Sequence, residues 1–402
     1  MKQKVAEKIL LTGSSLPRAL QAAQINSRAA PSAVEGLSRT VNVNQVSVLS
    51  DGEKAYWATL DLIQNAKQSV CVATFILGKD GTGKAIVAAL TKKAKEGVSV
   101  FLLLDALGSV GVKKRFLSPL RKAGGHTAFF MPMLHLPFRG RANLRNHRKM
   151  VIADGKSAIA GGMNLADEYM GTGDTPKRWQ DLSMLINGPV CAQIYDIFLS
   201  DWLFASGKDS ERPIALGPRT EDRPDALVQV MASGPDVKED ALRDMIITAL
   251  FHAESRIWIV TPYFVPDELL LDALCLAAKR GIDLRVVIPK KSNHVLADLA
   301  REGYLSQLQE CGASVFLYLP GMLHAKAIIM DDRVAITGSA NMDMRSLLLN
   351  YELALCIYHR DVIIQLKDWM QQLMDNCVER SQHKNQTLSL IEGIGRLFAP
   401  LL

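Results

Sequence analysis

The chain has 402 residues, of which 48% are hydrophobic, and a formal net charge of +6 with neutral histidines. This length and composition suffice for two domains with substantial cores, so we expect a globular protein rather than a disordered or fibrous one. The mildly basic balance favours anionic partners but does not choose between nucleic acid and an acidic membrane surface.

Two classes of protein are disfavoured by simple patterns. The six cysteines include no Cys-x-x-Cys pair, so we expect reduced thiols in a reducing compartment rather than a zinc or redox motif. No apolar run reaches the roughly 18 to 20 residues that a membrane span needs. The N-terminus also lacks the pattern of a secretory signal. We therefore expect a protein that is not integral to a membrane.

Residues 1–45 are interpreted as an N-terminal arm whose short helix either packs on the body or lies on a membrane. From residue 46 the pattern alternates between strands and helices. In the first half it predicts helices over 53–67 and 83–97 and strands over 69–77 and 98–105. In the second half it predicts helices over 236–253, 267–281 and 296–311 and strands over 256–263, 282–289 and 313–318.

The repeated rhythm predicts an α/β fold with two similar domains, over residues 46–210 and 225–402, joined by a polar, Pro-rich connection near 207–226. We expect two α/β/α sandwiches with mixed sheets, related by a pseudo-twofold axis. Residues 387–402 have apolar side chains at helical spacing. This C-terminal tail is interpreted either as an interfacial membrane helix or as a helix packed on the second domain.

One motif occurs twice at a constant offset. His147, Lys149 and Asp154 are followed by Gly161, Gly162 and Asn164, and the second copy lies 177 residues later. The residues of this second copy are His324, Lys326, Asp331, Gly338, Ser339 and Asn341. On a strand, alternation would place each His and Lys on one face. Two such copies around one point, with two asparagine amides, suit a phosphate group.

The two motif aspartates receive a different role. A carboxylate beside a phosphate would repel it, so Asp154 and Asp331 are expected to hold the fold of each motif. A nucleophilic histidine needs a carboxylate on its other ring nitrogen to fix the tautomer. Asp181 and Glu352, on strands expected to be equivalent in the two halves, are the candidates for this orienting role, against the alternative of exposed strand carboxylates.

A basic cluster surrounds the first motif, and its members are Arg139, Arg141, Arg145 and Arg148. Such a cluster either grips a phosphate bidentately or forms a solvated loop, and the sequence leaves both open. His294 follows the end of a predicted strand, where loops often face a site, so it is a further candidate for the cleft.

The doubled His-x-Lys-x(4)-Asp motif resembles the phospholipase D superfamily. That resemblance implies a single shared site in which one histidine attacks phosphorus and the other handles the leaving and incoming oxygens, without metal or cofactor. It makes His147, Lys149 and Asp154 and their second copies His324, Lys326 and Asp331 the catalytic set. Asn164 and Asn341 would bind the phosphate.

Finer likeness lies in residues 143–149, 161–165 and 338–352, which are similar to bacterial cardiolipin synthases of the phospholipase D type. This implies condensation of two phosphatidylglycerol molecules to cardiolipin and glycerol, with His147 favoured as the nucleophile. It also implies a peripheral enzyme on the anionic surface of the cell membrane, on its cytoplasmic side, that does not bind nucleic acid. Typical members carry N-terminal transmembrane segments, which this sequence does not show.

Three alternatives remain open. Water can replace the alcohol in the second step, which would make a hydrolytic phospholipase D that releases phosphatidic acid. A nuclease or phosphodiesterase would need basic grooves with aromatic platforms, and only 6% of the residues are aromatic. A binding module without catalysis is disfavoured because both motifs are intact. The oligomeric state is left open.

Overall fold

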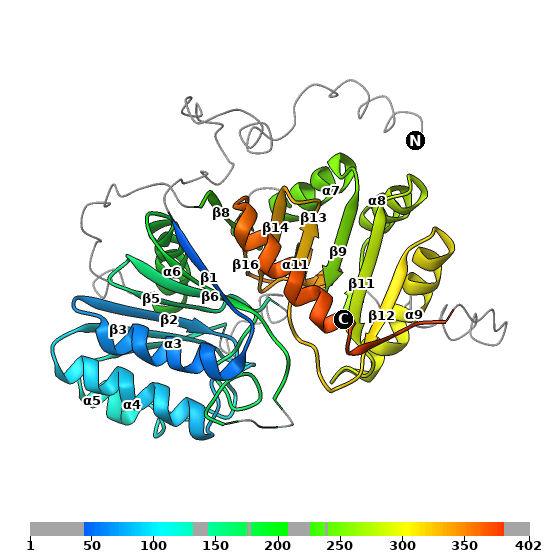
Figure 1. The fold of residues 1–402 in the computed structure, drawn as a ribbon. Coiled ribbons are helices and arrows are strands. Elements are labelled where there is room, and N and C mark those ends of the chain that lie inside the picture. The colour runs from blue at the N-terminus through cyan, green and yellow to red at the C-terminus, as the bar shows by residue number, and fades with distance from the viewer. Residues whose placement is uncertain are drawn as a thin grey trace, which may run out of the picture.

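The protein was analysed as a computed structural model, which describes residues 44–131, 144–173, 175, 178–207, 226–237 and 240–381. The described chain folds into two halves, each built on one mixed sheet (Figure 1). The first sheet comprises β1 (Gln45–Leu49), β2 (Ser69–Thr74), β3 (Ser99–Asp105), β4 (His126–Phe130), β5 (Met150–Ala153), β6 (Ser157–Gly161) and β7 (Ser183–Asn187). The second comprises β8 (Val228–Ser233), β9 (Arg256–Val260), β11 (Asp283–Pro289), β12 (Ser314–Tyr318), β13 (Ala327–Met330), β14 (Val334–Gly338), β16 (Glu352–Ile357) and β17 (Cys377–Glu379).

The two sheets have the same topology. Their strand orders are β1-β7-β6-β5-β2-β3-β4 and β8-β16-β14-β13-β9-β11-β12, and the second sheet adds β17 at its edge. In each, three neighbouring strands are parallel and the motif strands, β5 and β13, pair antiparallel with β2 and β9. The duplication therefore extends over the whole sheet, and the predicted α/β fold with mixed sheets is confirmed.

Helices cover both faces of each sheet. On the outer side of the first half lie α3 (Gly52–Asn65), α4 (Gly81–Lys95) and α5 (Ser118–Lys122). On the outer side of the second half lie α7 (Ala241–His252), α8 (Glu268–Lys279) and α9 (Val295–Glu310). The inner helices are α6 (Val190–Ser206) and α11 (Arg360–Met374), whose apolar side chains join both sheets in one central core. A short pair, β10 (Phe264–Val265) and β15 (Met342–Asp343), and the helix α10 (Met344–Leu348) complete the second half.

Local sequence explains where these elements begin and what they bury. Helix α4 starts after Asp80, whose side chain accepts a hydrogen bond from the Gly83 backbone N–H, as an N-cap residue does. Its Ile86 and Leu90 are fully buried against the sheet. Strand β3 lies in the middle of the parallel strands and is buried on both faces, which accounts for its continuous apolar run.

The elements differ from the expectations in a few places. Helix α7 begins at Ala241 rather than at 236, because the turn at Gly234 and Pro235 precedes it. The strand expected over 69–77 ends at Thr74, and β1 and β8 were not anticipated. The arm to residue 43 and the tail over 387–402 lie outside the described residues. Within the described ranges, no helix combines the length and apolarity required to cross a bilayer.

Candidate active site

The two motif histidines lie just before a strand rather than on one. Strand β5 begins at Met150 and β13 at Ala327, so the expectation that His147 and Lys149 lie on a strand was wrong: both come just before one. Their backbone is held by the other half instead. The His147 N–H donates to the Tyr351 carbonyl at 2.9 Å, and the His324 N–H donates to the Gln180 carbonyl at 2.7 Å. Each motif is thereby fixed across the interface between the halves.

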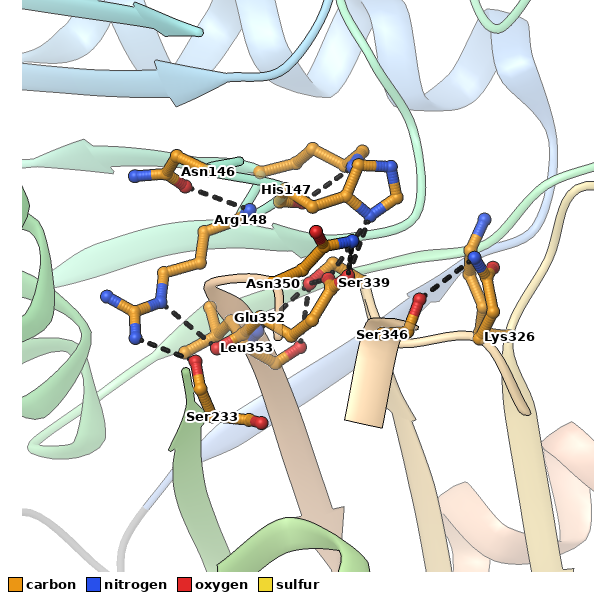
Figure 2. A network of polar contacts seen from close by, with 12 residues as sticks. Asn146, His147, Arg148, Ser233, Lys326, Ser339, Ser346, Asn350, Glu352 and Leu353 are labelled. Carbon is orange, nitrogen blue, oxygen red and sulfur yellow. Dashed lines mark hydrogen bonds and ion pairs between the residues drawn. The ribbon is translucent and has the colours of Figure 1, made fainter. Parts of the chain in front are cut away.

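This crossed backbone pairing decides which carboxylate meets which histidine. Tyr351 directly precedes Glu352, and the His147 Nδ1 lies 3.0 Å from a Glu352 oxygen. Gln180 directly precedes Asp181, and the His324 Nδ1 lies 2.7 Å from an Asp181 oxygen. Each carboxylate therefore contacts the histidine of the opposite half, as Figure 2 shows for His147 and Glu352. Both carboxylates are buried rather than exposed. Glu352 begins β16, whereas Asp181 lies two residues before β7 rather than on a strand.

Burial sets the charge state of these pairs. Desolvation and the charge of the neighbouring Lys326 together lower the pKa of His324 to about 3, although Asp181 opposes the shift. Desolvation likewise lowers the pKa of His147, although Glu352 opposes the shift. Burial alone would raise the pKa of Glu352, but His147, Lys149 and the Ser339 hydroxyl together outweigh burial, and the net pKa lies below its ordinary value. A neutral imidazole that donates its Nδ1 proton to a carboxylate exposes the Nε2 lone pair, which is the form a nucleophile or base requires.

Both motif lysines are buried beside these histidines. The Lys149 Nζ donates to the His147 carbonyl at 2.6 Å, and the Lys326 Nζ donates to the His324 carbonyl. Desolvation lowers the pKa of Lys149 to about 7, and the charge of Lys326 contributes to the same shift. Desolvation also lowers the pKa of Lys326 to about 8. Burying two cations beside each other is unfavourable because they repel and lose their hydration. An anion bound between Lys149 and Lys326 would relieve this cost, so the pair favours anion binding.

The motif aspartates point away from this centre. The Asp154 carboxylate accepts hydrogen bonds from the backbone N–H groups of Lys67, Gln68 and Ser69, at the start of β2. The Asp331 carboxylate accepts equivalent bonds from Ser255 and its neighbours before β9. Both aspartates adopt positive φ, at 52° and 53°, in the turn that follows the motif strand. Their contacts are those of residues that hold a turn against the sheet.

The two motif asparagines are not equivalent. The Asn164 Oδ1 accepts from the Ile76 N–H at 3.0 Å, so its carbonyl side is fixed to the segment after β2. The Asn341 Nδ2 donates to the Ser346 Oγ at 3.1 Å, and within the described chain its buried Oδ1 has no hydrogen-bond partner. Phosphate binding by these residues stays a prediction.

The glycines of the motif allow close approach of two strands. A Cβ at Gly161 would lie 2.4 Å from the Ser183 Cα, and one at Gly338 would lie 2.1 Å from the Leu353 carbonyl oxygen. A Cβ at Gly162 would lie 2.2 Å from an Asp181 oxygen. The second copy has Ser339 at the position of Gly162, and its hydroxyl donates to Glu352 at 2.5 Å. The glycines thus leave room for the orienting carboxylate and its strand.

The arginines nearest the first motif do not form a phosphate clamp or a solvated loop. Arg148 is fully buried, with its NH1 2.6 Å from Asp201 of α6 and its NH2 3.3 Å from Asp236 of the second half. Its Nε donates to the Glu352 carbonyl at 3.0 Å (Figure 2). Arg145 is also buried, 3.8 Å from Asp105. For Arg145 and Arg148, both the phosphate grip and the solvated loop were therefore wrong, because the two charges are neutralised inside the protein. Arg139 and Arg141 lie outside the described residues.

Aromatic rings around the histidines were not anticipated. The Phe75 ring meets the His147 ring edge to face, with centroids 5.0 Å apart. The Tyr169 and Trp179 rings lie 5.1 and 5.4 Å from the His324 ring. The sequence carried a signal for the ring of Tyr169. Asp181 lies 34 residues after His147, whereas Glu352 lies 28 residues after His324. The longer first segment contains Tyr169 and brings it to the site. These rings exclude water from one side of each imidazole.

Two further residues complete the contacts of the site. Asn350 lies beside Glu352, to which its Nδ2 donates at 3.4 Å, and it was not anticipated (Figure 2). His294, proposed for the cleft, caps the start of α9 and is exposed, with its ring centroid 5.8 Å from that of Tyr263. No contact joins it to the motif residues in the described chain.

Comparison with known proteins places this geometry in a family. A family model described as cardiolipin synthase, PLD-like domain, matches residues 59–202 and 246–374. Cardiolipin synthase 1 of Bacillus anthracis is 35% identical over 366 residues, which cover 88% of this chain and 72% of that protein. Cardiolipin synthase A of Pseudomonas entomophila is 35% identical over 392 residues, which cover 96% of this chain and 81% of that protein.

A solved structure has the same fold at low sequence identity. Phosphatidylserine synthase of Haemophilus influenzae Rd KW20 superposes with a TM-score of 0.68 at 16% identity, covering 96% of this chain and 97% of the other. This likeness concerns the fold alone, and it includes both halves.

Proposed function

Since the chain belongs to the cardiolipin synthase family with phospholipase D-like domains, we propose that it is a phosphatidyltransferase that condenses two phosphatidylglycerol molecules to cardiolipin and glycerol. The observation that carries this proposal is the crossed pair of histidine–carboxylate contacts, His147 with Glu352 and His324 with Asp181. Two oriented imidazoles between two buried lysines are what a two-step displacement at a phosphodiester requires.

In the first step, the His147 Nε2 attacks the phosphorus of phosphatidylglycerol. A P–N bond forms, the P–O bond to the headgroup glycerol breaks, and the glycerol oxygen takes a proton from His324. The bound phosphate supplies the negative charge that raises the pKa of His324 from its low value in the empty site, so that it can carry this proton. His147 is assigned the attack because its side chain is 13% exposed, against 5% for His324.

In the second step, His324 accepts the proton of a hydroxyl on another phosphatidylglycerol. The hydroxyl oxygen attacks phosphorus, the P–N bond breaks, and cardiolipin leaves with His147 restored. Lys149 and Lys326 turn from the histidine carbonyl oxygens to the phosphate oxygens, whose charge is greatest in the pentacoordinate state. Asn164 and Asn341 are proposed to add amide contacts to the same oxygens.

The positions of the other predicted residues fit this assignment. Asp154 and Asp331 hold the turns that place β5 and β13 beside β2 and β9. The enzyme has two units, residues 46–210 and 225–402. Each unit contributes one histidine and the carboxylate that orients the histidine of the other unit. The partners proposed are phosphatidylglycerol and the anionic surface of the cell membrane, on its cytoplasmic side, with the protein attached peripherally.

The test is thin-layer chromatography of products formed from labelled phosphatidylglycerol in mixed micelles by wild type, His147→Ala and His324→Ala. We expect cardiolipin from wild type and a loss of about 10³-fold or more in each variant, since each histidine acts in both steps. If phosphatidic acid were the only product, the protein would be a hydrolase rather than a transferase. Lack of any lipid turnover, with cleavage of a nucleic-acid phosphodiester, would overturn the proposal.

A further inference from the structure

The outer surface of the first half holds a basic groove that the transfer reaction does not use. Its cavity, of about 910 Å³, lies between α4 and the segment that follows β3. Six cations line it, and they are Lys79, Lys84, Lys92, Lys95, Lys113 and Arg115. No Asp or Glu belongs to its described lining, and none of the six forms an ion pair with a described carboxylate. Six cations with no acidic residue in the described lining attract an extended anionic partner.

The segment after β3 also exposes apolar side chains. Residues 106–117 contain Lys113, Lys114 and Arg115 but no acidic residue. In the same segment Leu107 is 44% and Val110 67% exposed to solvent. Large apolar side chains beside several cations suit a surface that is anionic outside and apolar beneath, which is the profile of a bilayer of acidic lipids.

The second half repeats this combination at the equivalent place. Residues 290–299 follow β11, the counterpart of β3, and begin with the exposed Lys290 and Lys291. Val295 is 73% and Leu296 58% exposed in the first turn of α9. The one carboxylate of the segment, Asp298, is occupied by the Ser292 N–H and by Arg301. The pseudo-twofold relation thus gives two segments of similar character.

Both segments lie at the same sheet edge as the motif histidines. Strand β5 runs antiparallel to β2, so His147, just before β5, lies at the carboxyl end of β2. Strand β3 is parallel to β2, which places residues 106–117 at that edge. The same pairing of β13, β9 and β11 places residues 290–299 at the edge of His324.

We propose that residues 106–117 and 290–299 are the docking face for an anionic lipid bilayer, with Lys79 and Lys84, at the N-terminal end of the α4 groove, holding lipid phosphates beside it. Leu107, Val110, Val295 and Leu296 enter the interface while the lysines and Arg115 meet the headgroups. This inference rests on the proposed function, because a substrate embedded in a bilayer must reach the histidines from this edge. A bilayer is favoured over nucleic acid because no described aromatic side chain lines the groove except Phe116.

The test is co-sedimentation of the full chain with vesicles of phosphatidylcholine alone or with an equal part of phosphatidylglycerol. The charge variant is Lys113→Gln/Lys114→Gln/Arg115→Gln, and the matched control is Lys67→Gln/Lys156→Gln/Lys279→Gln, whose exposed lysines lie at the opposite sheet edge. Each lysine or arginine at an anionic surface contributes about fivefold in partitioning, so the charge variant should bind about 100-fold more weakly and the control like wild type. Binding should also weaken with added salt.

A second pair of variants tests the apolar contribution. Val295→Ser/Leu296→Ser should reduce partitioning about tenfold or more, whereas Leu276→Ser, an exposed leucine on α8, should not. All these residues are exposed, so their variants are expected to fold, which circular dichroism checks. Unchanged vesicle binding by the charge variant would overturn the docking face, as would a preference of that surface for a single-stranded oligonucleotide over the vesicles.

Activity on short-chain phosphatidylglycerol below its micelle concentration separates the two proposals. The docking variants should turn over this monomeric substrate like wild type, because they do not touch the histidines. If wild type binds anionic vesicles but transfers no phosphatidyl group in either form, the proposed function fails while the docking face stands. If turnover is normal but vesicle binding does not respond to the variants, the docking face fails alone.

Discussion

Replacing Arg148 should measure how much of the stability of the protein depends on one buried charge between the two halves. Its guanidinium is inaccessible to solvent and contacts Asp201 at 2.6 Å and Asp236 at 3.3 Å. It also donates to the carbonyl oxygens of Ser233 and Glu352, both at 3.0 Å. Arg148→Met keeps much of the volume but leaves the Asp201 carboxylate buried without its cation.

The magnitude follows from these contacts. Removing one partner of a buried ion pair costs about 3 to 5 kcal/mol. Two carbonyl oxygens that lose a donor add about 1 kcal/mol each. Arg148→Met should therefore lower the free energy of unfolding by about 5 to 7 kcal/mol, which is a large fraction of the stability of an ordinary domain. The double variant Arg148→Met/Asp201→Asn should recover about half of this loss, because no charge is then left buried.

The pH dependence adds an independent check. Burial raises the pKa of Asp201 to about 6, although Arg148 opposes the shift, so removal of Arg148 must raise this pKa further. A carboxyl with a folded pKa above its unfolded value of about 3.9 binds more protons when folded, so stability falls as pH rises between the two values. Arg148→Met should thus be less destabilised at pH 5 than at pH 8.

The assay is urea denaturation followed by tryptophan fluorescence, at both pH values, for wild type, the single variants and the double variant. A strictly additive double variant, or a loss for Arg148→Met below about 1 kcal/mol, would refute the view that Arg148 acts by neutralising Asp201. A loss that did not change with pH would argue against the charge on Asp201 as the cause.

Two further changes concern the reaction itself. The pKa of Lys149 is lowered to about 7 and that of Lys326 to about 8, so the cationic forms that bind phosphate are lost as pH rises through these values. We therefore expect kcat/KM to fall above pH 7 to 8. In Lys149→Arg the remaining activity should lose the lower of these two transitions, because arginine stays charged. Persistence of the whole alkaline limb in that variant would contradict the assignment. Gly162→Ala should push Asp181 away from His324, since the new Cβ would lie 2.2 Å from an oxygen of the Asp181 carboxylate. We expect kcat to fall by about 10²-fold or more, and Ser339→Ala, at the equivalent position, to have a smaller effect. Equal kcat values for wild type and Gly162→Ala would count against this role of Gly162.

Sequence alone was enough for the elements that depend on local pattern. The fixed offset between His147 and His324 indicated the duplication, and alternating apolar runs located most helices and strands because burial of one face imposes a period on the chain. The charge argument for Asp154 also needed no coordinates, since a carboxylate next to a phosphate is unfavourable. The local pattern did not locate the ends of strands, such as the start of β5 at Met150, because propensity changes little over two or three residues there.

Only the tertiary structure decided how the two halves exchange contacts. Sequence spacing made Asp181 and Glu352 candidates to orient a histidine, but the bridges of Gln180 and Tyr351 to the opposite motif determine that each serves the other half. Arg148 looked like a surface cation because its burial depends on Asp201 and Asp236, which are distant in sequence. Which charges end up inside a protein is decided by partners that the fold brings together, and local sequence carries no record of those partners.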